Sequence, residues 1–201
     1  LICERLRSLR MSGMADAFES QMLDPNADLA PFIERFTEIV NHEWQIRYDK
    51  KFKRYLKQAH LRYPDADLDE TIYDPARKLD TAAIERLATC HWIDEGKNLL
   101  ITGMTSSGKT HLSNALCISA LRQLKTVRYI RANTLMLELE QARLKSTYLE
   151  YVTALSKLDL LAIDDFGLME LDLDKCRDLF EVIDGRDGRR STIIISQFPI
   201  K

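Results

Sequence analysis

The sequence contains few cysteines, and their spacing does not form a recognisable site. Its four cysteines, at positions 3, 90, 117 and 176, are scattered and include no C-x-x-C pair. A paired-cysteine metal site is therefore not indicated, and His91 beside Cys90 has no partner pattern for a metal ion either. We expect reduced, mostly buried thiols in a cytoplasmic protein.

Long apolar runs are also missing from the sequence. No stretch approaches the roughly 20 apolar residues that a membrane span needs, and the first residues do not resemble a signal peptide. We therefore expect no membrane contact. The chain starts at Leu1 rather than at an initiator Met and stops shortly after a strand-like run, so we expect the natural protein to continue at both ends.

An excess of charge of one sign is the third absence. The 201 residues carry a formal net charge of −2, with 30% charged and 45% hydrophobic residues. Such a balance excludes a protein that binds nucleic acid through its overall charge, so any nucleic-acid site must come from local clusters. The length allows one α/β core and an appendage.

The strongest pattern that is present is residues 103–110, which read G-M-T-S-S-G-K-T. They match G-x-x-x-x-G-K-[ST], the phosphate-binding loop of nucleoside triphosphatases. An apolar strand pattern over 98–102 precedes the loop, and a helical pattern begins at Lys109. Gly103 and Gly108 allow a tight turn that brings backbone N–H groups onto phosphate oxygens, and the helix dipole adds to these donors.

Each side chain of this loop suggests a role. Lys109 can reach the β- and γ-phosphates, and the Thr110 hydroxyl can ligate Mg²⁺. We therefore expect ATP and Mg²⁺ as ligands. The alternative is a chance match in a glycine-rich turn, but the order strand, loop, helix argues against it. The residues expected to bind nucleotide are Gly103, Thr105, Ser106, Ser107, Gly108, Lys109, Thr110 and His111.

A second strong pattern is residues 158–165, L-D-L-L-A-I-D-D. A continuous apolar run is typical of a parallel strand that is buried on both faces, and its two acids fall at the C-terminal end, where α/β sheets place ligands. Asp164 is expected to hold Mg²⁺, usually through water. Asp165 is expected to orient or deprotonate an attacking water. The alternative is a surface turn before Phe166, which the phosphate loop upstream makes weak.

Strands and helices alternate from residue 98 onward, which predicts a parallel sheet and an α/β fold. Further strands are expected over 126–132 and 192–196. Gln197 stands at the tip of the last strand, which we expect beside 158–165. Its amide can position water against the γ-phosphate, although plain strand termination is the alternative. The catalytic residues expected are Lys109, Asp164, Asp165 and Gln197.

The N-terminal part has a different pattern, which divides the chain into three. Residues 1–62 are expected to form a helical domain for DNA binding or assembly, 63–89 an acidic linker, and 90–201 the α/β core. A long helix is predicted from about 29 to 62, after a helical stretch over 1–22. Within the linker, Thr81 is expected to cap a short helix over 82–88, and in the core Asn133 or Thr134 is expected to cap the helix after the strand 126–132. Trp92 could flank a purine ring, with packing in the core equally expected.

The long predicted helix carries a local basic cluster. Between residues 45 and 62 there are seven Lys or Arg and one acid, Asp49. We interpret this as a clamp for the phosphate backbone of DNA, without base readout; a solvated helix face is the alternative. Trp44, Tyr48 and Phe52 share a neighbouring face, which either holds the helix in place or packs on the first helix. The DNA contacts expected are Arg47, Lys50, Lys51, Arg54 and Lys57, with Arg143 and Lys145 as additional candidates that also suit a helix C-terminus.

Three runs carry a family resemblance: G-M-T-S-S-G-K-T-H-L, I-D-D-F-G-L and D-G-R-D-G-R-R-S-T-I-I-I-S-Q-F-P. Together they resemble the IstB transposition helper ATPases, which group with the helicase loader DnaC among the AAA+ proteins. The resemblance covers the sequence from about residue 90 to the end, and it is reasonable for the helical N-terminal region. It implies a parallel-sheet P-loop AAA+ core, with the C-terminal part of the AAA+ domain absent from this sequence.

The resemblance also implies residue roles. Lys109 and Thr110 match Walker A, Asp164 and Asp165 match Walker B, and Gln197 matches the sensor-one position. Many AAA+ members have Glu where this chain has Asp165, and the shorter side chain favours a slow nucleotide switch over a fast motor. The arginine finger, fifth strand and lid of the family follow the sensor-one strand, so they cannot be assigned. Exposed candidates for contact with another subunit or with DNA are Arg186, Arg189 and Arg190.

The function implied is an ATP-dependent homo-oligomer that binds double-stranded DNA without sequence preference and recruits or activates a partner transposase, IstA, during transposition. Hydrolysis would be completed by a neighbouring subunit. The nearest alternative is a DnaC-like loader of a replicative helicase, which has the same chemistry and another partner. A P-loop kinase is less expected, because no acceptor pocket is indicated. A nucleotide-gated DNA-binding module that scarcely hydrolyses ATP stays open because of Asp165.

Overall fold

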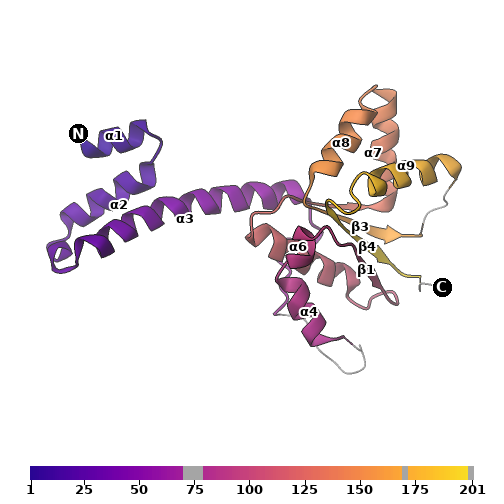
Figure 1. Ribbon diagram of the computed structural model, residues 1–201, viewed down its shortest axis with the longest axis horizontal. Helices are drawn as coiled ribbons and strands as arrows, with labels where there is room; N and C mark the ends of the chain where they lie inside the picture. Colours follow the sequence, from indigo (N-terminus) through magenta and orange to yellow (C-terminus); the bar gives the residue numbers. More distant parts are fainter. Residues whose placement is uncertain (70–78, 169–171, 199–201) are drawn as a thin grey trace. The chain divides into compact units, whose positions relative to one another are not determined.

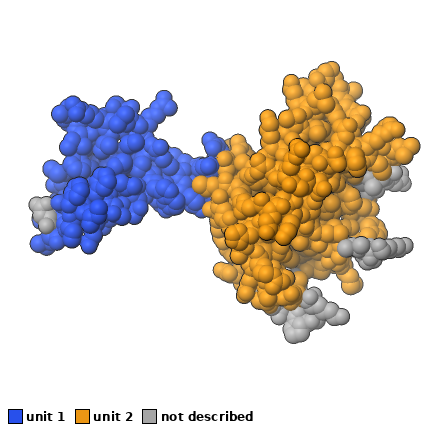
Figure 2. Space-filling view, viewed as in Figure 1, with its two compact units in different colours: residues 1–54 blue, residues 55–201 orange. Residues whose placement is uncertain are grey.

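The computed structural model describes residues 1–69, 79–168 and 172–198. The chain forms two compact units, Leu1–Arg54 and Tyr55–Lys201 (Figure 2). The boundary between them falls inside one long helix, and each unit is described by itself below. Among the described residues, no helix combines the length and apolar character that crossing a bilayer requires.

The first unit is built from helices. It contains α1 (Ile2–Ser8), α2 (Ser12–Leu23), a short 3₁₀ helix (Ala27–Leu29) and most of α3 (Phe32–Ala59). The helical stretch expected over 1–22 is thus broken in two, because Arg10 takes a left-handed conformation at φ 59°. The long helix is confirmed, with bounds slightly narrower than the predicted 29–62.

Gly13 allows α2 and α3 to approach closely. A Cβ at this position would lie 2.8 Å from the Glu43 carboxylate and 2.8 Å from the Ile46 side chain. The carboxylate instead accepts a hydrogen bond from the Met14 N–H at 3.2 Å, and His42 Nδ1 lies 3.0 Å from the Gly13 carbonyl. A side chain at position 13 would therefore displace the Glu43 carboxylate and the end of the Ile46 side chain, and would lie 3.1 Å from the Glu43 Cα.

The aromatic residues of α3 form a stacked row along the helix. Trp44 stacks on Tyr48 with ring centroids 5.3 Å apart, and Tyr48 stacks on Phe52 at 6.3 Å. Trp44 remains 60% exposed, so this side chain does not pack on the first helices as one of the sequence interpretations required.

The second unit contains a four-stranded parallel sheet in the order β1-β4-β3-β2. Its strands are β1 (Leu99–Thr102), β2 (Val127–Arg131), β3 (Leu160–Phe166) and β4 (Ser191–Ser196). The α/β prediction is confirmed, as is the expected position of the last strand beside β3. The first four residues of β3 are apolar and all buried, as expected for a parallel strand covered on both faces.

Helices lie on both faces of this sheet, with α7, α8 and α9 on one side and α6 on the other (Figure 1). The helices of the second unit are α4 (Thr81–Ala88), α5 (His91–Asp94), α6 (Lys109–Arg122), α7 (Ala132–Leu144), α8 (Tyr148–Lys157) and α9 (Leu173–Asp184). Trp92 is only 8% exposed, and its Nε1 donates to the Leu87 carbonyl at 3.0 Å. Trp92 therefore packs in the core, which confirms one of the two expectations for this residue.

Two helix starts differ from the sequence prediction. Asp80, not Thr81, caps α4, because its Oδ1 accepts from the Ala83 N–H at 3.1 Å. Neither Asn133 nor Thr134 caps α7: this helix begins at Ala132 directly after β2, and its first position makes no side-chain capping bond. The turn from strand to helix leaves no loop in which a separate capping residue could lie.

The expectation that Arg186 is exposed is wrong. Its side chain is fully buried, and its guanidinium donates to the Leu155 carbonyl, to the Ser191 carbonyl at 2.6 Å and to Thr192 Oγ1 at 3.1 Å. Burial lowers the pKa of Arg186 to about 10. These bonds connect the end of α8 to the start of β4. Arg186 therefore holds the core together and is not available to a partner or to DNA.

Candidate nucleotide-binding site

The phosphate-loop sequence lies between the end of β1 and the start of α6. Gly108 is the residue before α6 and has a left-handed conformation at φ 85°. A residue with a Cβ adopts this conformation only with strain, so glycine is required to turn the chain into the helix. Lys109 and Thr110 form the first positions of α6, where unpaired N–H groups and the helix dipole favour an anion.

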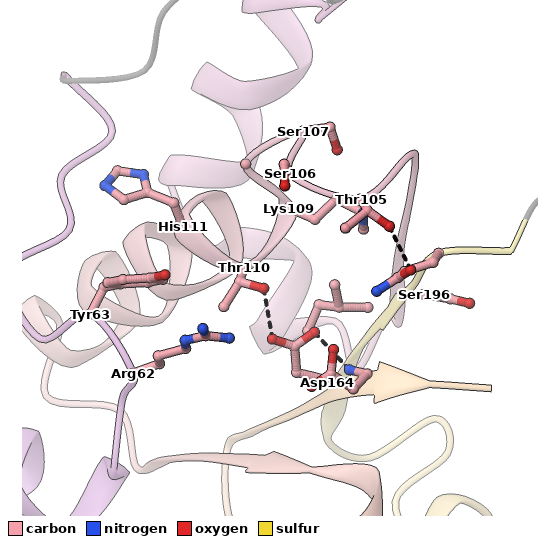
Figure 3. A pocket seen from close by; sticks show the side chains of 14 residues that line it. Arg62, Tyr63, Thr105, Ser106, Ser107, Lys109, Thr110, His111, Asp164 and Ser196 are labelled. Carbon is pink, nitrogen blue, oxygen red and sulfur yellow. Dashed lines mark hydrogen bonds between the residues drawn. The ribbon is translucent and has the colours of Figure 1, made fainter. Parts of the chain in front are cut away.

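A cavity of about 340 Å³ lies over this loop (Figure 3). It brings together residues from the loop, from the ends of β3 and β4 and from the segment that follows α3. Most of the residues expected from the sequence line it, whereas Gly103 lines a neighbouring pocket on the other side of the loop. The lining residues are Arg62, Tyr63, Thr105, Ser106, Ser107, Gly108, Lys109, Thr110, His111, Asp164, Asp165, Ile195, Ser196 and Gln197.

Asp164 is a buried carboxylate at the edge of the cavity with three hydrogen-bond donors. It is 2% exposed. Its Oδ2 accepts from Thr110 Oγ1 at 2.8 Å and from the Tyr129 hydroxyl at 2.7 Å, while its Oδ1 accepts from the Asp165 N–H at 2.7 Å. Donors thus surround a buried carboxylate and fix its orientation.

The pair formed by Thr110 and Asp164 fits a magnesium ion. Both supply oxygen, which Mg²⁺ prefers, and they are close enough to hydrogen-bond. Within the described residues, no group of three or more His, Cys, Asp or Glu side chains could form an all-protein metal site. This is compatible with Mg²⁺, which keeps several waters and takes its other ligands from phosphates.

Asp165 lies beside the metal pair and has a different environment. Its backbone is in the left-handed region at φ 55°, which is sparsely populated for residues other than glycine. Its Oδ2 is 3.6 Å from Arg131 Nε, at the end of β2. The carboxylate is about one-third exposed, so water can reach it, as a group that activates water requires.

Lys109 and Gln197 contact the loop from inside the cavity. Lys109 Nζ donates to the carbonyls of Gly103 at 2.7 Å and Met104 at 2.6 Å, which holds the ammonium within the loop. Gln197 Oε1 accepts from Thr105 Oγ1 at 2.7 Å. The tip of β4 is therefore linked to the phosphate loop, and a ligand that displaces Thr105 would break its hydrogen bond to Gln197.

Sequence reasoning missed three residues of this site: Arg62, Tyr63 and Tyr129. Tyr129 lies in β2. In the sequence, an aromatic residue within a strand cannot be distinguished from an ordinary core residue. Burial, and then its hydrogen bond to Asp164, raise the pKa of the Tyr129 hydroxyl, so it stays protonated and donates at neutral pH. Arg62 and Tyr63 were at the edge of the basic segment, with no motif to link them to the loop.

The candidate DNA contacts on α3 include one residue that also holds the first unit together. Arg47 pairs with Glu43 at 2.5 Å and donates to the Arg10 carbonyl at 2.7 Å, so it also stabilises the packing of the first unit. Exposed residues of α3 include Lys50, Lys51, Arg54 and Lys57.

The candidates at the end of α7 differ from each other. Arg143 pairs with Asp178, and its guanidinium lies 4.5 Å from the centroid of the Tyr148 ring. Lys145 follows the helix and is exposed. Arg143 thus has a structural role between α7, α8 and α9, whereas Lys145 is exposed to solvent.

Comparisons with known proteins agree with this geometry. The family model of IstB-like ATP-binding proteins matches residues 4–201. The chain is 39% identical to an ATP-binding protein of insertion sequence IS1162 from Pseudomonas fluorescens, over 97% of this chain and 84% of that protein. It is 34% identical to an insertion-sequence ATP-binding protein of Sinorhizobium fredii, over 98% of this chain and 80% of the relative.

Solved structures show the same fold. The DnaC helicase loader matches with a TM-score of 0.58 and 24% identity, over 70% of this chain and 81% of that chain. DnaA from Aquifex aeolicus, bound to AMPPCP, matches with a TM-score of 0.59 and 20% identity, over 67% of this chain and 42% of that chain. The parallel sheet with its phosphate loop is thus a fold that this chain shares with DnaC and DnaA.

Proposed function

This chain belongs to the family of IstB-like ATP-binding proteins, and we propose that its ATP-bound form assembles on double-stranded DNA to direct a transposase to its target. The relatives from Pseudomonas fluorescens and Sinorhizobium fredii are ATP-binding proteins of insertion sequences. ATP is therefore the nucleotide expected here. Assembly, DNA binding and the transposase are parts of the proposal.

The observation that carries the nucleotide chemistry is the direct hydrogen bond from Thr110 to the buried Asp164, beside the loop that holds Lys109. In the proposed complex, the loop N–H groups bind the phosphates and Lys109 moves from the loop carbonyls to the β- and γ-phosphates. Thr110 and Asp164 hold Mg²⁺, the latter through water. When bound there, this ion would offset the negative charge that develops on the phosphate oxygens.

Hydrolysis in this proposal depends on Asp165 and Gln197. The carboxylate of Asp165 accepts a proton from, or orients, the attacking water, and the Gln197 amide holds that water near the γ-phosphate. The ion pair between Asp165 and Arg131 competes for the same carboxylate. We therefore propose slow hydrolysis, with a cation from a neighbouring copy needed to stabilise the transition state.

The DNA-binding part of the proposal rests on α3. Its exposed Lys and Arg side chains lie along one helix, with few acids among them to neutralise their field. Lys and Arg that contact phosphates release bound cations, so this binding weakens as salt is added and does not depend on sequence. ATP would then promote assembly, and hydrolysis would reverse it.

Phosphate release tests the activity and separates it from its rivals. Wild-type protein is expected to hydrolyse ATP faster when duplex DNA is added, and Lys109→Ala to be inactive in both conditions. Hydrolysis that does not respond to DNA would favour a small-molecule kinase. Capture of a purified replicative helicase, but not of a transposase, would favour a helicase loader, whose fold this chain shares.

A further inference from the structure

Residues 61–69, here called the strap, follow α3 and pack along α6. Ala66 is 3% exposed and belongs to a small apolar cluster with Ala115 of α6. Farther along the same helix, Arg122 pairs with Asp67 at 2.6 Å. The strap is therefore attached at successive turns of the helix that begins in the phosphate loop.

One buried amide ties the strap to the nucleotide site. Asn114 is fully buried; its Oδ1 accepts from the Tyr63 N–H at 3.0 Å, and its Nδ2 donates to the Thr110 carbonyl at 2.8 Å. The same residue thus contacts the strap backbone and the residue proposed to bind Mg²⁺. A buried amide with both ends satisfied fixes the groups around it, because losing either bond leaves a buried polar atom unpaired.

This attachment places Arg62 in the cavity. Its guanidinium is directed towards Thr110 and Asp164 (Figure 3). Across the described part of the chain Arg62 forms no ion pair; its guanidinium carbon lies 5.5 Å from the centroid of the Tyr63 ring, and that ring in turn contacts His111. The nearby carboxylates already have donors, Tyr129 for Asp164 among them. Arg62 is thus a cation presented to the cavity.

The position of Arg62 indicates which phosphate it would meet. Thr110 and Asp164 are the residues that would hold Mg²⁺, the ion that accompanies the outer phosphates of a nucleoside triphosphate. A guanidinium directed to that side of the cavity would face the terminal phosphate, and its planar fork suits a phosphate group. ADP lacks this group, so only ATP would gain the contact.

We propose that Arg62 binds the terminal phosphate of ATP within its own chain, so that ATP, unlike ADP, holds the strap that continues α3. The inference rests on the proposed nucleotide function and deepens it. His60, between α3 and the strap, has a left-handed conformation at φ 52°, so the helix ends there and the chain turns towards the cavity. The segment that follows α3 would thereby be held differently with ATP than with ADP.

Isothermal titration of full-length protein with Mg²⁺ and either AMPPCP or ADP, without DNA, tests this role. Because a hydrogen bond to a charged group is lost, Arg62→Gln is expected to weaken AMPPCP binding about 10- to 100-fold, while ADP affinity changes less than about twofold. Arg62→Lys should recover part of the loss. The matched control is Arg177→Gln, which removes an exposed arginine that, among the described residues, forms an ion pair with Asp174 of its own helix.

Three results would overturn the inference. An unchanged ratio of AMPPCP to ADP affinity in Arg62→Gln would exclude contact with the terminal phosphate. Equal weakening of both nucleotides would indicate a general electrostatic effect or a disturbed strap. A wild-type protein that binds neither nucleotide would overturn the proposed function, and the inference with it. This outcome is separate from the other two because it is seen without any change at Arg62.

Discussion

Replacing Tyr129 by Phe removes one hydroxyl and leaves the ring in place. This hydroxyl donates to Asp164 Oδ2 at 2.7 Å, the oxygen that also accepts from Thr110. Tyr129 is 6% exposed and Asp164 2%, so water cannot readily replace the lost donor. The carboxylate should lose part of its fixed orientation, and the proposed magnesium site should weaken.

The size of the effect follows from the type of bond. A hydrogen bond to a charged group contributes about 1.5–3 kcal/mol, and each 1.4 kcal/mol corresponds to about a factor of ten. Partners that orient metal ligands typically change metal affinity by about 10- to 100-fold. We therefore expect the Mg²⁺ concentration for half-maximal ATP binding to rise by about 10- to 100-fold in Tyr129→Phe.

The assay is a Mg²⁺ titration of fluorescent ATP binding, repeated in EDTA. The control is Tyr151→Phe, which removes a half-buried phenol that donates to a carboxylate, Glu138, outside the cavity. Both variants should lose similar stability, but only Tyr129→Phe should need more Mg²⁺. An equal Mg²⁺ requirement in wild type and Tyr129→Phe would refute the positioning role of this residue.

Three other predictions concern the core, the pH dependence and α3. Arg186→Ala should lower the free energy of unfolding, measured by urea titration, by about 3–5 kcal/mol, because it leaves buried carbonyls without donors. The control is Arg189→Ala at an exposed position, which should change this free energy by no more than about 0.5 kcal/mol. Burial disfavours the ionised form of Asp159, but hydrogen bonds from the N–H and the hydroxyl of Thr126 outweigh burial and lower the pKa of Asp159 below its ordinary value of 3.8. The stabilisation from ionised Asp159 is therefore present above about pH 3.8 and is lost as the pH falls through the lower pKa of the folded state. Asp159→Asn should flatten the pH dependence of the urea midpoint in this acid range. A pH dependence as steep as that of the wild type would contradict the assignment. The double variant Lys50→Glu and Lys51→Glu should bind duplex DNA more weakly and reduce the salt slope by roughly 2; fluorescence anisotropy at several salt concentrations that gives the wild-type slope would exclude these contacts.

The sheet and the phosphate loop could be predicted because their signals are local. A buried parallel strand reads as a continuous apolar run, as in β3, and the loop needs glycine at a fixed spacing before Lys109. The adjacency of β3 and β4 followed from the tendency of α/β folds to gather polar residues at one sheet edge. Such patterns need no knowledge of which distant residues are in contact.

The remainder could not be predicted because it depends on contacts between distant segments. Arg186 was expected at the surface, since an arginine near glycines usually is exposed; the acceptors that allow its burial come from α8 and β4. Residues 63–69 of the strap were expected to be part of a linker, and their sequence gives no sign of the buried Asn114 that binds Tyr63. Tyr129 carries no motif that would identify Asp164 as its partner.

The central claim is that ATP binding in this cavity drives assembly on DNA. Sedimentation velocity of the protein with duplex DNA and AMPPCP, with ADP, or without nucleotide tests it most directly. We predict a large protein–DNA species with AMPPCP that is absent with ADP and absent in Lys109→Ala under all conditions. Identical sedimentation of wild type and Lys109→Ala with DNA and AMPPCP would contradict the claim.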